Sequence, residues 1–88
     1  MDIAVIAGAS SGIGAATARQ LALGGYKVIL VARNRDALEK VAGKIGPLAI
    51  VEPCDATDGD AVLDLASRIL RDHGVPNVLV NIESRISR

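Results

Sequence analysis

A glycine-spaced loop near the start of the chain constrains the fold more than any other feature. Gly8, Gly12 and Gly14 stand between an apolar run, Ile3–Ala7, and an alanine-rich stretch typical of a helix. The first glycine permits a tight turn, the second leaves the backbone open to an anion, and the third lets the helix pack against the strand. Free N–H groups and the dipole at a helix start favour negative charge. The loop therefore predicts a strand, a turn and a helix that form a cradle for phosphate groups.

Short runs rich in valine and isoleucine alternate with helical patterns along the chain. The runs predict four buried strands, at residues 3–7, 27–32, 48–52 and 77–81. Helices are expected between them, over about residues 13–23, 34–46 and 57–74. Asn34 and Thr57 are the expected N-caps of the second and third helices. This alternation predicts an α/β fold with right-handed crossovers: a Rossmann-type parallel sheet in the order 3-2-1-4, a truncated form of a doubly wound fold.

Two of the helical patterns carry an apolar stripe with helical spacing. The stripe of the second helix is Leu38, Val41, Ala42 and Ile45, and that of the third is Val62, Leu65, Ala66 and Ile69. We expect the first two helices to cover one sheet face and the third to cover the other.

Charge and cysteine content exclude several classes of function. Ten acidic and ten basic residues give no net charge, which argues against binding nucleic acid or a membrane surface through overall charge. No apolar run reaches the roughly 20 residues that span a bilayer. The single Cys54 excludes an intramolecular disulfide and a cysteine zinc site, so a reducing, cytoplasmic setting is expected.

The residues after the later strands indicate which ligand the cradle takes. An NAD site places an acidic residue about 20 residues beyond the glycine loop, but this chain has Ala32 followed by Arg33. An arginine suits the 2′-phosphate of NADP, so the sequence favours NADP, although a solvated Arg33 is an alternative. Asp55 follows the third strand, where its carboxylate can accept a hydrogen bond from an adenine amino group. The alternative is a structural role, as a helix cap or in a turn. Asn81 ends the fourth strand, where it serves a ligand or the backbone groups between strands.

Over residues 2–81 the chain resembles the short-chain dehydrogenase/reductase family. The resemblance rests on the Gly-x-x-x-Gly-x-Gly loop, the basic residue at Arg33, the pair Asp55-Ala56 and the segment Leu79-Val80-Asn81. The resemblance implies that the glycine loop contacts the phosphates and that Arg33 and Asn34 contact the 2′-phosphate. It also implies that Asp55 and Ala56 contact the adenine, and that Asn81 lies near the adenosine ribose. The expected cofactor-binding residues are Gly8, Ser10, Ser11, Gly12, Ile13, Gly14, Arg33, Asn34, Asp55, Ala56 and Asn81.

The resemblance stops after Asn81, where the family continues Asn-Ala-Gly and this chain reads Ile82-Glu83-Ser84. The family's catalysis needs a serine and a Tyr-x-x-x-Lys pair. The only tyrosine is Tyr26, and Leu30 stands where the lysine would be. We therefore expect a dinucleotide-binding half-domain at 1–81 and a divergent tail at 82–88, with no catalytic residues and no metal ligands.

Three functions compete on these observations. The first is an NADP(H)-binding module that is not catalytic alone. The second is a fragment of a complete NADP-dependent oxidoreductase acting on a carbonyl or alcohol. The third is a structural protein that binds no nucleotide. In each case the fourth strand would leave an apolar sheet edge and a partly bare sheet face, so we expect self-association as a homodimer through one of them.

Overall fold

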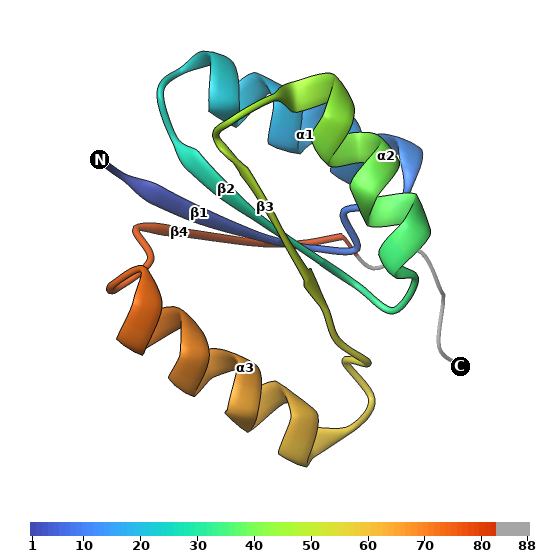
Figure 1. Ribbon diagram of the computed structural model, residues 1–88, viewed down its shortest axis with the longest axis vertical. Helices are drawn as coiled ribbons and strands as arrows, with labels where there is room; N and C mark the ends of the chain where they lie inside the picture. The colour runs from blue at the N-terminus through green and yellow to red at the C-terminus, as the bar shows by residue number, and fades with distance from the viewer. Residues whose placement is uncertain (83–88) are drawn as a thin grey trace.

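The computed structural model describes residues 1–82, so the expected tail lies outside the described residues from Glu83 onward. Strands and helices alternate strictly along the chain (Figure 1). Their bounds are β1 (Ile3–Ala7), α1 (Gly12–Leu23), β2 (Lys27–Ala32), α2 (Arg35–Ile45), β3 (Ala49–Pro53), α3 (Gly59–Asp72) and β4 (Val78–Asn81). The expected strands are confirmed, with β3 beginning and ending one residue later than predicted and β4 beginning one residue later.

The four strands form one parallel sheet in the order β3-β2-β1-β4, as the alternation predicts. The centre of the sheet is fully apolar, because β1 and β2 are buried on both faces. Helices α1 and α2 cover one face, and α3 lies alone against the other (Figure 1). The predicted layering is therefore confirmed.

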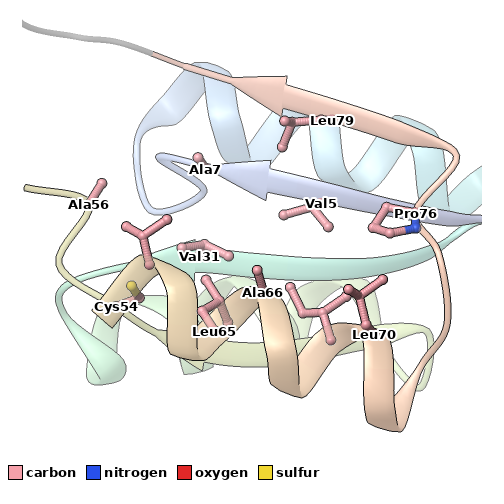
Figure 2. Close-up of a pocket in the computed structure, with 12 residues that line it drawn as sticks. Val5, Ala7, Val31, Cys54, Ala56, Leu65, Ala66, Leu70, Pro76 and Leu79 are labelled. Carbon is pink, nitrogen blue, oxygen red and sulfur yellow. The ribbon is translucent and has the colours of Figure 1, made fainter. Parts of the chain in front are cut away.

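The unequal number of helices leaves part of one face open. Strands lie about 4.8 Å apart and packed helices about 10 Å apart, so one helix covers roughly two strands. Two helices therefore suffice for the α1–α2 face, whereas α3 leaves the side toward β4 bare. An apolar groove of about 340 Å³ lies there, between α3 and the strands β1 and β4 (Figure 2).

The predicted stripe of α2 is correct, since Leu38 is buried and its other members pack against the same core. The stripe of α3 is only half correct. Leu65 and Ile69 are buried, but Val62 and Ala66 are exposed and line the groove, because no element among residues 1–82 covers that side of the helix.

A polar side chain caps the start of each helix. Ser11 caps α1, a role that the sequence analysis did not assign to it. Asn34 caps α2 as predicted, and its Oδ1 accepts from the Ala37 N–H at 3.1 Å. The cap of α3 is Asp58, which accepts from the N–H groups of Asp60 and Ala61. The prediction of Thr57 as the cap is wrong, because its N–H and hydroxyl both donate to Asp55, two residues earlier.

The two outer edges of the sheet differ in chemistry. β3 contains Pro53, which has no N–H to offer, and Glu52, which pairs with Arg68 of α3 at 3.0 Å. β4 has neither a proline nor a charged residue, and its Leu79 is 72% exposed. Within residues 1–82, no strand pairs with the outer side of β4, which is the exposed apolar edge that the sequence predicts.

Candidate functional site

The expected site residues lie along one edge of the sheet because the strands run in parallel register. Ala7, at the end of β1, pairs with Val31 of β2 and with Asn81 of β4, and Val31 pairs with Glu52 of β3. The residues that follow these positions therefore emerge side by side. Such a carboxyl edge is where open α/β sheets bind ligands.

The backbone of the glycine loop depends on two residues without a side chain. Gly8 has φ +81°, and its N–H donates to the Val31 carbonyl at 2.8 Å, which ties the turn to β2. A Cβ on Gly8 would collide with the Ile82 carbonyl oxygen, and a Cβ on Gly14 would collide with the Gly8 carbonyl oxygen. Both glycines are thus required by close backbone contacts.

Gly12 is different, because nothing lies within 4 Å of the position where its Cβ would be. Open space above the first residue of α1 is what an approaching phosphate needs. Within residues 1–82 no hydrogen bond occupies the N–H groups of Gly12 and Ile13, and the first turn of the helix carries no acid. The structure thus has the space, the donors and the favourable dipole that an anion requires.

Ser11 shapes the loop from within. Its hydroxyl donates to the Gly8 carbonyl and accepts from the Gly14 N–H, each at 2.9 Å. Its own N–H donates to the Gly8 carbonyl at 3.1 Å. The hydroxyl that the resemblance assigns to phosphate contact therefore already holds the turn. Neighbouring Ser10 is exposed and has no hydrogen bond among the described residues.

Two arginines follow β2, and the structure gives them different surroundings. Arg35 pairs with Glu39 at 3.5 Å across one turn of α2. Arg33 forms no ion pair with any described residue and stands directly after the last residue of β2. Arg33 is therefore the guanidinium available at the carboxyl edge, and Asn34 beside it caps α2.

Asp55 turns the chain after β3. Its Oδ1 accepts from the Thr57 hydroxyl at 2.7 Å and from the Thr57 N–H at 2.9 Å. These two hydrogen bonds, with a smaller contribution from the charge of Arg33, lower the pKa of Asp55 below its ordinary value. The turn expected as one alternative for Asp55 is thus present. Both bonds use Oδ1, and Oδ2 has no partner among residues 1–82.

The other side of the loop is bounded by the end of β4. Asn81 is exposed, and the Ile82 N–H donates to the Ala7 carbonyl at 2.9 Å, which extends the ladder one residue beyond the strand. The Ile82 backbone then lies directly against Gly8. The departure from the family pattern at Ile82 therefore touches the loop itself.

Other polar candidates lie away from this edge. Tyr26 precedes β2, at the opposite end of the sheet, as expected from its place in the sequence. Cys54 faces the apolar groove, and burial raises the pKa of its thiol. Among the described residues there is no cluster of histidine, cysteine, aspartate and glutamate that could hold a metal. No helix described here is both long and apolar enough to traverse a bilayer.

The partly bare sheet face expected from the sequence is present in the structure as an apolar groove. The lining of the groove is apolar and comes mainly from α3 and from strand residues of β1, β2 and β4. At the carboxyl edge of the sheet it includes Ala7 and Ala56. The exposure of the fourth strand was the signal in the sequence, but helix periodicity alone does not show whether a stripe is covered.

Known proteins match the chain over most of its length. The family model described as short chain dehydrogenase matches residues 2–83. An uncharacterized oxidoreductase of Mycobacterium bovis is 42% identical over 92 residues, a match covering 98% of this chain and 27% of the relative. The chain therefore spans about a quarter of the length of that relative.

Solved structures agree with the fold. A metagenomic short-chain oxidoreductase in complex with NADP matches with a TM-score of 0.85 and 41% identity, over 89% of this chain and 37% of that one. A 3-ketoacyl-(acyl-carrier-protein) reductase from Brucella melitensis complexed with NADH matches with a TM-score of 0.82 and 35% identity, over 89% and 32%. Proteins similar to this chain thus carry either dinucleotide.

Proposed function

The chain belongs to the short-chain dehydrogenase family, and on that premise we propose that it is an NADP(H)-binding module, not catalytic by itself. The observation that carries the proposal is the open space at Gly12 beside two N–H groups with no partner among the described residues. The proposed contacts to the dinucleotide come from the cofactor-binding residues expected from the sequence. Ser11 differs from them, because its hydroxyl holds the loop in shape. When bound, NADP(H) supplies or accepts a hydride at a carbonyl or alcohol carbon.

The phosphate contacts of the proposal are mainly backbone contacts. The N–H groups of Gly12 and Ile13 would donate to the pyrophosphate, and Ser10 is exposed beside them. The Ile13 side chain is 70% exposed, so its part in binding is assigned to its backbone. Gly8 and Gly14 contribute by setting the direction of the loop.

The choice of NADP over NAD depends on Arg33. Arg33 stands at the carboxyl edge of the sheet and has no ion-pair partner in residues 1–82. The preceding residue is Ala32, so the position where an NAD site has a carboxylate carries no charge that would repel a 2′-phosphate. Asn34 would lie beside that phosphate. Asp55 and Ala56 would contact the adenine through the unused Oδ2 and the apolar side chain, and Asn81 would lie near the adenosine ribose.

Titration with NADPH and NADH tests the proposal. We expect NADPH to bind more tightly, and Arg33→Ala to remove that preference by weakening NADPH about tenfold or more, in line with the loss of a charged hydrogen bond of about 1.5–3 kcal/mol. Arg35→Ala is the matched control, because Arg35 already pairs with Glu39.

The outcomes separate the parts of the proposal. Binding of neither dinucleotide would refute it and leave the structural role. Equal binding of both would refute only the NADP preference. Loss of preference in Arg35→Ala and not in Arg33→Ala would show that the wrong arginine has been assigned.

A longer oxidoreductase is the second candidate. The observation that favours it is that the matched relative is nearly four times as long as the matched segment. The message downstream of the codon for Asn81 distinguishes the two: a binding module ends soon after it, whereas a complete oxidoreductase continues with a serine and a Tyr-x-x-x-Lys pair. For either candidate we expect a reducing compartment such as the cytoplasm, where the buried thiol of Cys54 stays unpaired.

A further inference from the structure

Two opposite charges follow the ends of the neighbouring strands β2 and β3. Ala32 lies opposite Pro53 in the register, and the Cys54 N–H donates to the Ala32 carbonyl at 2.9 Å. Arg33 is the first residue after β2, and Asp55 is the second after β3. The charge of Arg33 is near enough to contribute to the lowered pKa of Asp55. Among the described residues, however, no ion pair joins the two side chains.

Thr57 accounts for the lack of an ion pair between these neighbours. Its hydroxyl and its N–H donate to the same carboxylate oxygen of Asp55, Oδ1, at 2.7 and 2.9 Å. Arg33 is exposed, so an ion pair with it would be screened by water. A hydrogen bond to a charged group stabilises more than an exposed ion pair does. The two bonds from Thr57 therefore hold the carboxylate in preference to Arg33.

The position of the Asp55 carboxylate matters for a ligand with a 2′-phosphate. A guanidinium has five N–H donors in a fixed fork, and those that bind a carboxylate are not available to a phosphate. A carboxylate paired with Arg33 would also bring a negative charge toward the phosphate. NADPH carries this phosphate and NADH does not, so an Arg33–Asp55 pair would weaken the binding of NADPH alone.

We propose that Thr57 is a positioning residue for the choice of cofactor: it holds the Asp55 carboxylate away from Arg33 and so leaves the guanidinium for the 2′-phosphate of NADPH. The inference rests on the proposed function and adds to it a residue that acts through Asp55. The adenine contact proposed for Asp55 is the same in NADPH and NADH. The preference between the two dinucleotides therefore reports on Arg33 and not on the adenine.

A structural role is the alternative for Thr57, because its bonds to Asp55 shape the turn before α3. Loss of a structural bond would weaken NADPH and NADH by the same factor. Loss of a positioning bond would change the ratio of their two dissociation constants. That ratio is therefore the quantity to measure.

Titration of Thr57 variants with NADPH and NADH tests the proposal. Thr57→Val removes the hydroxyl and should reduce the preference for NADPH about two- to fivefold, the range expected for an exposed ion pair. Thr57→Ser keeps the hydroxyl and should keep the preference. Thr17→Val is the matched control, because the Thr17 hydroxyl bonds the Ile13 carbonyl and does not touch Asp55. Circular dichroism shows whether each variant is folded.

The same titrations in an Asp55→Asn background isolate the carboxylate charge. Asparagine has no charge to pair with Arg33, so adding Thr57→Val should leave the NADPH preference unchanged in this background. An equal fall of the preference in both backgrounds would overturn the proposal. Equal weakening of NADPH and NADH by Thr57→Val alone would also overturn it and leave Thr57 a structural role. A wild type that binds neither dinucleotide would instead refute the proposed function, and this inference with it.

Discussion

Gly12 and Gly14 have opposite structural roles within one loop, and alanine substitutions separate them. Gly14→Ala should lower the free energy of unfolding by about 1–3 kcal/mol, because its methyl group meets the rigid Gly8 carbonyl. Gly12→Ala should change it by less than about 1 kcal/mol, since nothing lies near the new methyl group and alanine favours the helix. The same Gly12 variant should bind NADPH more weakly, because the methyl group enters the space proposed for phosphate.

Urea unfolding and NADPH titration measure both effects. Equal loss of stability in the two variants would mean that Gly12 is as tightly packed as Gly14. Unchanged NADPH affinity in Gly12→Ala would place the phosphates elsewhere.

Asp55 offers a test in acid. The Thr57 hydroxyl is the largest cause of its lowered pKa, so Thr57→Val should move that pKa back toward the ordinary value of about 3.9. A carboxyl group with a lowered pKa stabilises the fold above that ordinary value, and the contribution is lost as pH falls through the pKa of the folded state. The variant should therefore lose less stability than the wild type across this acidic window.

NMR titration of the side-chain carboxyl groups measures the shift directly. Thr17→Val is the control, because the Thr17 hydroxyl bonds the Ile13 carbonyl and does not touch Asp55. An Asp55 pKa that stays low in Thr57→Val would mean that the backbone N–H and Arg33 account for the shift.

For single residues, the sequence predicts where a side chain lies in the fold better than it predicts its hydrogen-bond or ion-pair partner. The spacing of the glycines and the place of Arg33 after β2 follow from the pattern. The role of Ser11 does not, because Ser10 and Ser11 are adjacent residues of one type, and only the direction of the turn decides which hydroxyl reaches the Gly14 N–H. In the same way, the sequence does not show that Arg35 pairs with Glu39 whereas Arg33 has no ion-pair partner among the described residues.

Among the elements, the start of α3 shows how neighbouring residues compete for one role. Asp58→Ala should cost about 0.5–2 kcal/mol, because its Oδ1 accepts from two N–H groups of the first turn. Thr57→Ala should cost less, since it removes one exposed hydroxyl bond and leaves the cap intact. Thermal unfolding of the two variants gives the order, and a larger loss in Thr57→Ala would restore Thr57 as the cap.

The elements themselves follow from the sequence because each carries its own signal. Valine and isoleucine runs mark the buried strands, and glycine marks the helix ends. The cap of α3 was misplaced by one residue because Thr57 and Asp58 both suit the position, and the Asp55 turn decides between them. The exposure of Val62 and Ala66 was beyond the sequence pattern, because a stripe is buried only where another element supplies its other side.

For the molecule as a whole, the layering was predictable because right-handed crossovers leave little choice. A chain that moves outward from β1 to β2 to β3 places α1 and α2 on one face, and the return to β4 places α3 on the other. The groove forms because α3 alone covers only part of the second sheet face. Its apolar lining and the bare edge beside it are therefore two results of one topology.

The outer edge of the sheet at β3 is protected against the addition of another strand. Exposed strand edges on both sides of a sheet allow addition without end, which is how fibrils grow. Here Pro53, which lacks an N–H, and the charged Glu52–Arg68 pair make the β3 edge a poor template for another strand. Replacement of Pro53 would thus threaten the solubility of this protein more than the stability of its fold.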